Sequence, residues 1–593
     1  MKLKRIGVIT AIVAVGALAL SGCSAGGSGD QSEIVAGTSI TVAQNQPFTS
    51  YNSVSATGNT TYNSNITYMT QLGFNYYDST PKLVKNTKFG TYKAISTDPL
   101  TVEYTVNKGV KWSDGTQVGA ADMMLSWASQ LSKYNDPKGV NFGAAGAGLL
   151  DLVKDVPKVS NGGRTITIKY DQPFVDWEVN LEPGLPAQAV YEEAFPNVTN
   201  GAKADKDLIK AFQTDDTASI TKIAQAWSTK FDMTSLPTDK KLYLSDGPYI
   251  LSKLVKDQYV TLVANKKYKG WGPEPKVSKI TVRNIPDETA QVQALQNGEI
   301  SVSYGQADAD TVAALKGLKG VTTTTTPTSS YEHVDLTFNN KGPFDPASYG
   351  GDAAKALAVR QAFLKALPRQ DIVTKLINPI AANEKLDDSQ TLLPGAAGYD
   401  DSIKANGSAD YQTVDIPGAQ ALLKQAGVKT PVNVKFMYAK SNPRRAAEFA
   451  LIQASEKQAG FNVIDNGNDD WGSLLGNKSY DAVLFAWQFT SLAVTGAQAQ
   501  FTTGGGSNYN GYSNADVDAT YKSLQSDYNK ANQIADLQKI DKDVWADAYG
   551  VTLFQFPDVT AFSNKVKNVK DAPLSPNVFW NYYDWTAPKA SVK

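Results

Sequence analysis

The feature that most constrains the fold is a single cysteine. Cys23 is the only cysteine in a chain of 593 residues. A chain with one cysteine cannot form an internal disulfide, so its stability has to come from a large hydrophobic core, which this length allows. Zinc sites built from four thiolates and iron–sulfur clusters need several cysteines, and they are excluded.

The residues before Cys23 have the layout of a secretory signal. Three basic residues among the first five precede an uncharged, mostly apolar run over 6–20. This run is shorter than the about 20 apolar residues that a membrane span needs. The stretch Leu-Ser-Gly-Cys at 20–23 resembles the bacterial lipobox, in which the signal is cut before the cysteine and the cysteine is lipidated. The alternative is an ordinary small-residue cleavage site that contains a cysteine.

We therefore predict a signal peptide over 1–22 and a lipid on Cys23 that anchors the protein to the cell membrane outside the cytoplasm. The Gly- and Ser-rich stretch over 23–37 reads as a flexible tether. Lipidation would also consume the only thiol, so a cysteine nucleophile is not expected.

Charge argues against a nucleic-acid partner. The chain has 57 basic and 58 acidic residues, a net charge of −1, with no long block of one sign. Apart from the signal, no segment is apolar over the length of a membrane span.

Strand and helix patterns alternate along the chain, which predicts an α/β fold. The polar, Asn- and Thr-rich stretch over 50–65 is predicted to be a loop or a surface segment. The predicted strands are 38–43, 101–106, 164–170, two within 249–263, 279–282, 332–339, 432–438, 462–464, 480–487 and 551–556. The predicted helices are 120–131, 288–295, 355–366, 417–425 and 444–458.

Catalytic constellations are scarce. His333 is the only histidine and lies in an alternating strand, where we expect a packed or surface side chain. No serine lies in a Gly-x-Ser-x-Gly motif, and the adjacent acids at 387–388, 400–401 and 469–470 are expected to be solvated. We predict that the protein is not an enzyme and has no cofactor and no metal. A surface hydrolase that uses a carboxylate pair and a cell-surface adhesion or scaffold protein remain as alternatives.

A series of segments occurs in a fixed order over nearly the whole chain. They include the long Glu103–Thr116 segment, which contains Val-Lys-Trp-Ser-Asp-Gly-Thr, then Ser-Asp-Gly-Pro-Tyr at 245–249, Ala-Leu-Gln-Asn-Gly-Glu-Ile at 294–300, Gly-Pro-Phe-Asp at 342–345, Ala-Leu-Leu-Lys-Gln-Ala-Gly at 421–427, Tyr-Asp at 480–481 and Asn-Tyr at 508–509. Together they resemble the extracellular solute-binding proteins of family 5, the peptide, dipeptide and nickel receptors of ABC importers.

The resemblance implies a two-lobed fold of the periplasmic-binding-protein type (type II), with an extra subdomain inserted in lobe 1. Lobe 1 would comprise 38–78, 243–328 and 555–593, the inserted subdomain 79–242, and lobe 2 329–554. Hinge strands would join the lobes near Ser329–Tyr331 and Leu553–Phe556. Ligand contacts on both lobes would favour a closed form that docks on a permease.

The resemblance also implies the partners and the ligand-binding residues. We expect a monomer that captures oligopeptides, or alternatively an oligosaccharide, and delivers them to ABC permease subunits with their ATPases. Nickel is disfavoured because the chain has one histidine and no free thiol. The expected ligand-binding residues are Ala56, Thr57, Gly58, Tyr304, Gln306, Trp471, Trp487, Gln488, Phe489, Thr490, Phe554 and Gln555, with Phe556 beside them.

Thr490 departs from the family pattern. Peptide-binding members often have an Asp three residues after the position of Trp487, where it pairs with the α-amino group of the peptide. A threonine hydroxyl can accept a hydrogen bond but cannot neutralise an ammonium. This position therefore predicts that binding does not depend on a free amino terminus.

Overall fold

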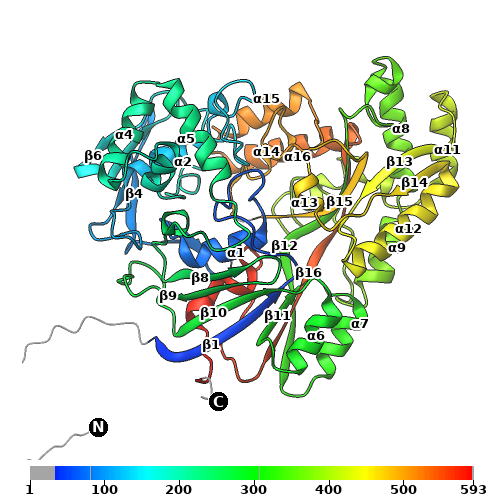
Figure 1. The fold of residues 1–593 in the computed structure, drawn as a ribbon. Helices are drawn as coiled ribbons and strands as arrows, with labels where there is room; N and C mark the ends of the chain where they lie inside the picture. Colours follow the sequence, from blue (N-terminus) through cyan, green and yellow to red (C-terminus); the bar gives the residue numbers. More distant parts are fainter. Residues whose placement is uncertain (1–33, 81, 306, 490, 590–593) are drawn as a thin grey trace, which may run out of the picture.

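The computed structural model describes residues 34–80, 82–305, 307–489 and 491–589, and its centre is a ten-stranded mixed sheet (Figure 1). Cys23, Gln306 and Thr490 lie outside the described residues. The strand order is β14-β13-β15-β12-β16-β11-β1-β10-β9-β8. In that order the strands are Phe461–Asp465, Val432–Met437, Ala482–Gln488, Val321–Leu336, Gly550–Ser563, Val302–Gly305, Val35–Gln44, Val277–Asn284, Tyr259–Ala264 and Tyr249–Val255.

The two longest strands, β12 and β16, are neighbours at the centre of the view in Figure 1. They pair antiparallel, with register shifts between Pro327 and Tyr331 and between Glu332 and His333. Pro327 lies opposite Pro557, and proline has no N–H to donate, so the hydrogen-bond ladder is weakened there. These irregularities fall where the sequence predicts the hinges. The hinges and the domain boundaries themselves stay predictions.

A separate region at the upper left of Figure 1 has its own four-stranded sheet, in the order β4-β5-β7-β6. These strands are Gly90–Thr97, Leu100–Val106, Thr165–Lys169 and Lys158–Ser160. Four helices accompany them: α2 (Ala120–Ser129), α3 (Ala187–Ala194), α4 (Gly201–Gln213) and α5 (Thr217–Thr229). A small two-stranded sheet pairs β2 (Asn75–Tyr77) with β3 (Leu83–Lys85).

The remaining helices flank the large sheet. They are α1 (Thr61–Thr70), α6 (Glu288–Gln296), α7 (Ala309–Gly317), α8 (Ala353–Ala366), α9 (Arg369–Ile372), α10 (Tyr399–Ser402), α11 (Ile416–Gln425), α12 (Pro443–Ala459), α13 (Trp471–Leu474), α14 (Gln498–Phe501), α15 (Ala515–Leu524) and α16 (Lys530–Ala546). Among the described residues, no helix combines the length and the apolarity that crossing a membrane requires.

The hydrophobic side chains form separate cores on the two sides of the molecule. One core contains β1, β8, β9 and β10 together with the four-stranded sheet and its helices. A second contains residues of β13, β14, α8 and α12, and it includes Phe554 of β16. Two cores joined through long central strands are what a two-lobed protein requires.

Local sequence explains why individual elements form where they do. In β5, Val102, Tyr104 and Val106 are fully buried and alternate with half-buried residues, as the sequence predicts for a strand. Helix α2 begins after Gly119, whose N–H donates to the Asp122 carboxylate at 2.7 Å. A carboxylate in the first turn also offsets the positive end of the helix dipole.

The predicted strands and helices are confirmed within a few residues at their ends, with two qualifications. β12 and β16 extend well beyond the predicted 332–339 and 551–556. Several helices were not predicted, among them α3, α4, α5, α7 and α15. The 17-residue helix α16 was also missed, because most of its residues are polar and its buried set is limited to Ile540, Asp541, Val544 and Trp545.

The prediction of a loop or surface segment over 50–65 is confirmed as a loop over 51–60 and is wrong for 61–65, which lie in α1. Ser50, Tyr51 and Asn52 are buried, and α1 begins at Thr61. The polar side chains can be buried because they bond to nearby backbone: Asn63 accepts from the N–H of Thr49 at 2.8 Å and donates to the carbonyl of Gly58 at 2.9 Å.

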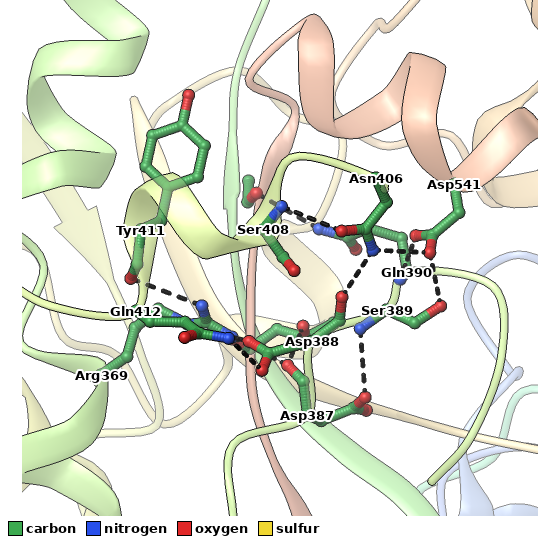
Figure 2. Close-up of polar contacts among 12 residues, drawn as sticks. Arg369, Asp387, Asp388, Ser389, Gln390, Asn406, Ser408, Tyr411, Gln412 and Asp541 are labelled. Atoms are coloured by element: carbon green, nitrogen blue, oxygen red, sulfur yellow. Dashed lines mark hydrogen bonds and ion pairs between the residues drawn. The ribbon is translucent and has the colours of Figure 1, made fainter. Parts of the chain in front are cut away.

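The prediction that Asp387 and Asp388 are solvated is also wrong. Both are buried in a polar cluster that Figure 2 shows, which we call the Asp541 network: Arg369, Asp387, Asp388, Ser389, Asn406 and Asp541. The Asp541 carboxylate accepts from the Ser389 hydroxyl at 2.8 Å and the Asn406 amide at 2.8 Å, and Arg369 pairs with Asp388 at 2.9 Å. Arg369 also donates to the carbonyl of Thr552 at 2.8 Å, so the network fastens β16 to its neighbours just before the predicted hinge.

Candidate ligand-binding cavity

A cavity of about 730 Å³ is lined by segments that are far apart in sequence, from Asn45 to Trp580. Its walls come from α1 and the residues before it, from β2, α2 and the loop before α3, from β15, and from the central strand β16. A volume of this size is typical of small-molecule and peptide sites. The cavity therefore lies where the two predicted lobes and the inserted region meet.

Six of the described residues predicted to bind ligand line this cavity. They are Ala56, Thr57, Tyr304, Trp471, Trp487 and Gln488. Phe556, named beside them, also lines it. The structure thus brings together side chains from four distant parts of the chain, and their role in ligand binding stays a prediction.

The other described residues of the predicted set do not line the cavity. Phe554 is fully buried in the hydrophobic core, and the Gln555 side chain donates to the carbonyl of Thr328. The ring of Phe489 packs toward Tyr331, with 6.1 Å between the ring centroids. At Gly58 a Cβ atom would lie 2.0 Å from the carbonyl oxygen of Asn52, so this glycine serves a close backbone approach.

One wall of the cavity is aromatic. The ring of Trp487 is stacked on that of Tyr509, with 5.9 Å between centroids and 11° between planes. Phe485 packs edge-on against Trp487 at 5.3 Å and lies 5.8 Å from Trp471. The wall is backed by His333, which is buried, the packed one of the two predicted outcomes, and its Nδ1 is hydrogen-bonded to the Asp335 carboxylate at 2.7 Å. Such a wall offers flat apolar surface to a ligand.

Arg445 is the only basic residue among the described residues that line the cavity. Its Nε donates to the buried Glu332 carboxylate at 2.9 Å, and its guanidinium lies 5.3 Å from the centre of the Trp471 ring. Burial tends to raise the pKa of Glu332, but Arg445 and Arg444 outweigh it and lower that pKa. Within the described part of the chain the Arg445 guanidinium has no other hydrogen-bond partner, so its terminal nitrogens are available to an acceptor in the cavity.

Three acids line the cavity, and two of them accept hydrogen bonds from backbone N–H groups. Glu182 accepts from the N–H of Phe74 at 2.6 Å and from the amide of Asn75 at 3.3 Å, and burial raises its pKa to about 8. Asp78 accepts from the N–H and the hydroxyl of Thr80 at 2.8 Å and 2.7 Å. Glu182 thus holds the distant backbone at Phe74, and Asp78 holds its own loop.

The third acid, Asp558, lies on β16 and is 7% exposed. Its one hydrogen bond to a described residue comes from the Tyr304 hydroxyl at 2.8 Å. Sequence reasoning missed Asp558, Arg445 and Tyr509. The only sequence signal for Arg445 was a pair of arginines directly after Asn-Pro at a predicted helix start, which by itself reads as an exposed first turn.

Hydrogen bonds between distant segments lie beside the cavity, at Thr495 of its lining. The Asp176 carboxylate accepts from the N–H of Val494 at 2.8 Å and from the N–H and hydroxyl of Thr495 at 2.9 Å and 2.7 Å. The N–H of Val175 donates to the carbonyl of Gln525 at 2.8 Å. These bonds join the region that contains the four-stranded sheet to the segment that follows β15.

The described residues contain no group of three or more His, Cys, Asp or Glu side chains arranged to hold a metal ion. The geometry of the described residues is that of a partly open cavity with an aromatic wall, one arginine and one acid with spare capacity. Such a site can bind and orient a ligand of mixed polarity.

Comparison with known proteins places this geometry in a family. Uncharacterized lipoproteins of Mycobacterium leprae and Mycobacterium tuberculosis are each 24% identical to the chain, over 98% of it and 97% of their own lengths. The dipeptide-binding protein of Escherichia coli is 24% identical over 66% of the chain and 65% of its own length.

Among solved structures, the oligopeptide-binding protein AppA of Bacillus subtilis, in complex with a nonapeptide, has a TM-score of 0.72 at 18% identity. The match covers 93% of this chain and 99% of the AppA chain. The periplasmic EDTA-binding protein EppA has a TM-score of 0.73 at 22% identity, and the match covers 95% of this chain and 100% of EppA. These likenesses confirm the two-lobed fold. The model of the bacterial extracellular solute-binding proteins, family 5, matches residues 80–509, and the chain therefore belongs to that family.

Proposed function

We propose that the protein is the lipid-anchored receptor of an ABC importer, and that it captures oligopeptides in the cavity between its lobes and delivers them to a permease. The observation that carries this proposal is the cavity itself, which combines the aromatic wall around Trp487 with the available guanidinium of Arg445. Oligopeptide- and dipeptide-binding proteins among its relatives support the choice of ligand.

Each feature of the cavity has a part in capture. The Arg445 guanidinium can form charge-assisted hydrogen bonds with a ligand carboxylate, because only its Nε is engaged by Glu332. The Trp487 ring and its stacked neighbour Tyr509 offer a surface for an apolar or planar side chain. The amide nitrogens of Gln71 and Gln488 donate within the protein, to Tyr51 and Asn577, and their amide oxygens can accept from peptide N–H groups.

Release follows from the hinge geometry. A ligand that contacts both lobes stabilises the closed form by the difference between its affinities for the two forms. Contact with the permease would reopen the cavity about β12 and β16, where opposed prolines weaken the strand pairing.

Mass spectrometry of small molecules that co-purify with the protein is the direct test. Peptides released on denaturation, and absent from a Trp487→Ala, Arg445→Ala double variant, are the expected result. Recovery of oligosaccharides instead of peptides would favour the alternative ligand class, because sugar rings also stack on tryptophan. Chemical turnover of the bound ligand would contradict a receptor and favour a hydrolase.

The lipid anchor is tested separately at Cys23. Its relatives that are named lipoproteins support it. Cys23→Ala should leave the precursor uncleaved or release the protein from the membrane while the fold stays intact. Equal partition of variant and wild type into a detergent phase would contradict lipidation.

A further inference from the structure

One carboxyl group in the cavity accepts fewer hydrogen bonds than it has room for. Glu182 and Asp78 accept hydrogen bonds from backbone N–H groups of neighbouring segments, whereas Asp558 accepts none. Within the described chain its only partner is the Tyr304 hydroxyl, and no ion pair joins it to Arg445. A carboxylate has room for about four hydrogen bonds, so Asp558 has spare capacity.

The groups that face Asp558 make its surroundings favourable to a cation. Asp571 and Glu288 are acids, and Arg444 is the one base among its electrostatic neighbours. Arg444 is already engaged by Glu332, at 2.8 Å, and by Glu448. Two tyrosines, Tyr62 and Tyr304, are the other titratable neighbours, and the Tyr304 hydroxyl is bonded to Asp558 itself. A positive group brought to Asp558 would therefore meet more negative than uncompensated positive charge.

The strand position holds this carboxyl rigidly. Asp558 pairs with Thr326 of β12, and the next residue, Val559, pairs with Gly305 of β11. Tyr304, on β11, then reaches the carboxyl with its hydroxyl at 2.8 Å. A side chain fixed by strands on both sides loses little further freedom when a ligand binds.

We propose that Asp558, oriented by Tyr304, is the subsite that receives a cationic group of the ligand, such as the amino terminus of a bound peptide. The inference rests on the proposed function. It assigns to β16 the role that an acid at position 490 would have, and it replaces the expectation, drawn from Thr490 alone, that a free amino terminus is unimportant.

The subsite carries its own pH signature. Burial raises the pKa of Asp558 to about 7, the Tyr304 hydroxyl lowers it, and Asp571 raises it further. Only the ionised carboxyl neutralises a cation, so preference for a cationic ligand should fall as the pH falls through 7. The loss approaches tenfold per pH unit, or about 20-fold between pH 7.5 and pH 5.5. A peptide amino group, with an ordinary pKa of about 7.7–8.0, stays mostly protonated over that range.

The test uses a casein digest as the probe. Half of the digest is acetylated at its amino groups with an isotopic label, and the two halves are mixed and offered to the purified protein. Mass spectrometry of the retained peptides gives the ratio of free to acetylated forms. At pH 7.5 the wild type should prefer free peptides by about tenfold to 150-fold, the range for one charge-assisted contact. Asp558→Asn should bring the ratio close to one and make it independent of pH.

Two further variants keep the test specific. Asp78→Asn removes a negative charge from the same cavity but from a carboxyl that its own loop satisfies, and it should leave the ratio unchanged. Tyr304→Phe keeps the Asp558 carboxyl and removes the hydroxyl that lowers its pKa, so the midpoint of the pH profile should move to higher pH. Thermal unfolding confirms that each variant is folded.

The outcomes separate the two proposals. Retention of peptides with no preference for the free form, in both wild type and Asp558→Asn, overturns the Asp558 subsite and leaves a peptide receptor in place. A preference that Asp558→Asn does not change assigns the cation to another acid and overturns it as well. If no peptide of either form is retained, the oligopeptide function fails, and the subsite fails with it.

Discussion

Two pairs of buried charged side chains differ in how completely they are satisfied: Asp541 and Arg369 in one, Arg445 and Asp558 in the other. In the Asp541 network, one carboxylate accepts four hydrogen bonds, from Ser389, Gln390, Ser402 and Asn406, and Arg369 is fully buried among acceptors (Figure 2). In the cavity, the Arg445 guanidinium and the Asp558 carboxyl each have one described partner.

The difference teaches where to look for function. A buried polar group that is fully bonded repays its desolvation inside the fold and has nothing left to offer a ligand. A group with spare donors or acceptors at a cavity keeps that capacity for a molecule that enters. Changes in the Asp541 network should therefore affect stability, and changes in the cavity should affect affinity.

The largest effect is expected for Arg369→Met. The variant leaves Asp388 without its ion-pair partner and the carbonyl of Thr552 without its donor, both in the interior. The free energy of unfolding should fall by about 3–5 kcal/mol, as measured by chemical denaturation. Lys375→Met, which breaks an exposed pair with Asp371, is the matched control and should change it by less than about 0.5 kcal/mol. Equal effects of the two would contradict the comparison.

Arg445→Met should act mainly on affinity. Loss of a charge-assisted contact to the ligand corresponds to about 1.5–3 kcal/mol, or about tenfold to 150-fold in dissociation constant. Calorimetry with a peptide recovered from the protein measures it. Some stability is lost as well, because Glu332 then relies on Arg444 alone. Unchanged affinity in a folded variant would show that Arg445 is a structural residue of the same kind as Arg369.

A pair of tryptophans sharpens the contrast. Trp487 lines the cavity, whereas Trp545 is buried on α16, stacked on Tyr411 with 5.8 Å between centroids. Trp487→Ala should weaken peptide binding by about 1–2 kcal/mol with a small change in melting temperature. Trp545→Ala should lower the melting temperature and leave the affinity of the folded fraction unchanged. If both variants lose only stability, the aromatic wall is part of the core.

The smallest effect is expected at Asp387. Burial raises its pKa well above the ordinary value, and its Oδ2 has no partner among the described residues. The native state therefore holds this proton more tightly than the unfolded chain does, so this group's contribution to stability declines as the pH rises above about 4. Asp387→Asn should flatten that decline. Urea unfolding of both proteins at pH 5 and pH 7.5 measures it, and parallel pH profiles would contradict the assignment.

Local features of the chain were predictable from sequence because they depend on neighbours. The alternation of β5 and the helical spacing of α2 appear directly in residues 101–131, and a lone cysteine excludes disulfides wherever the chain folds. The ordered motifs pointed to the family. Trp487, Trp471 and Tyr304 could be placed at the cavity because they lie in or beside those motifs.

Other features were decided only by the tertiary structure, because they depend on partners far away in the sequence. The stretch over 50–65 looks exposed until Asn63 is seen to satisfy buried backbone, and Asp387 and Asp388 look solvated until Arg369 lies against them. Asp558 reads as an ordinary strand residue, and its place in the cavity follows from the pairing of β16 with β11 and β12, 230 or more residues away. Composition and periodicity predict helices and strands because these depend on nearby residues. Burial and charge pairing depend on the packed chain, and packing therefore determined which charges are left for a ligand.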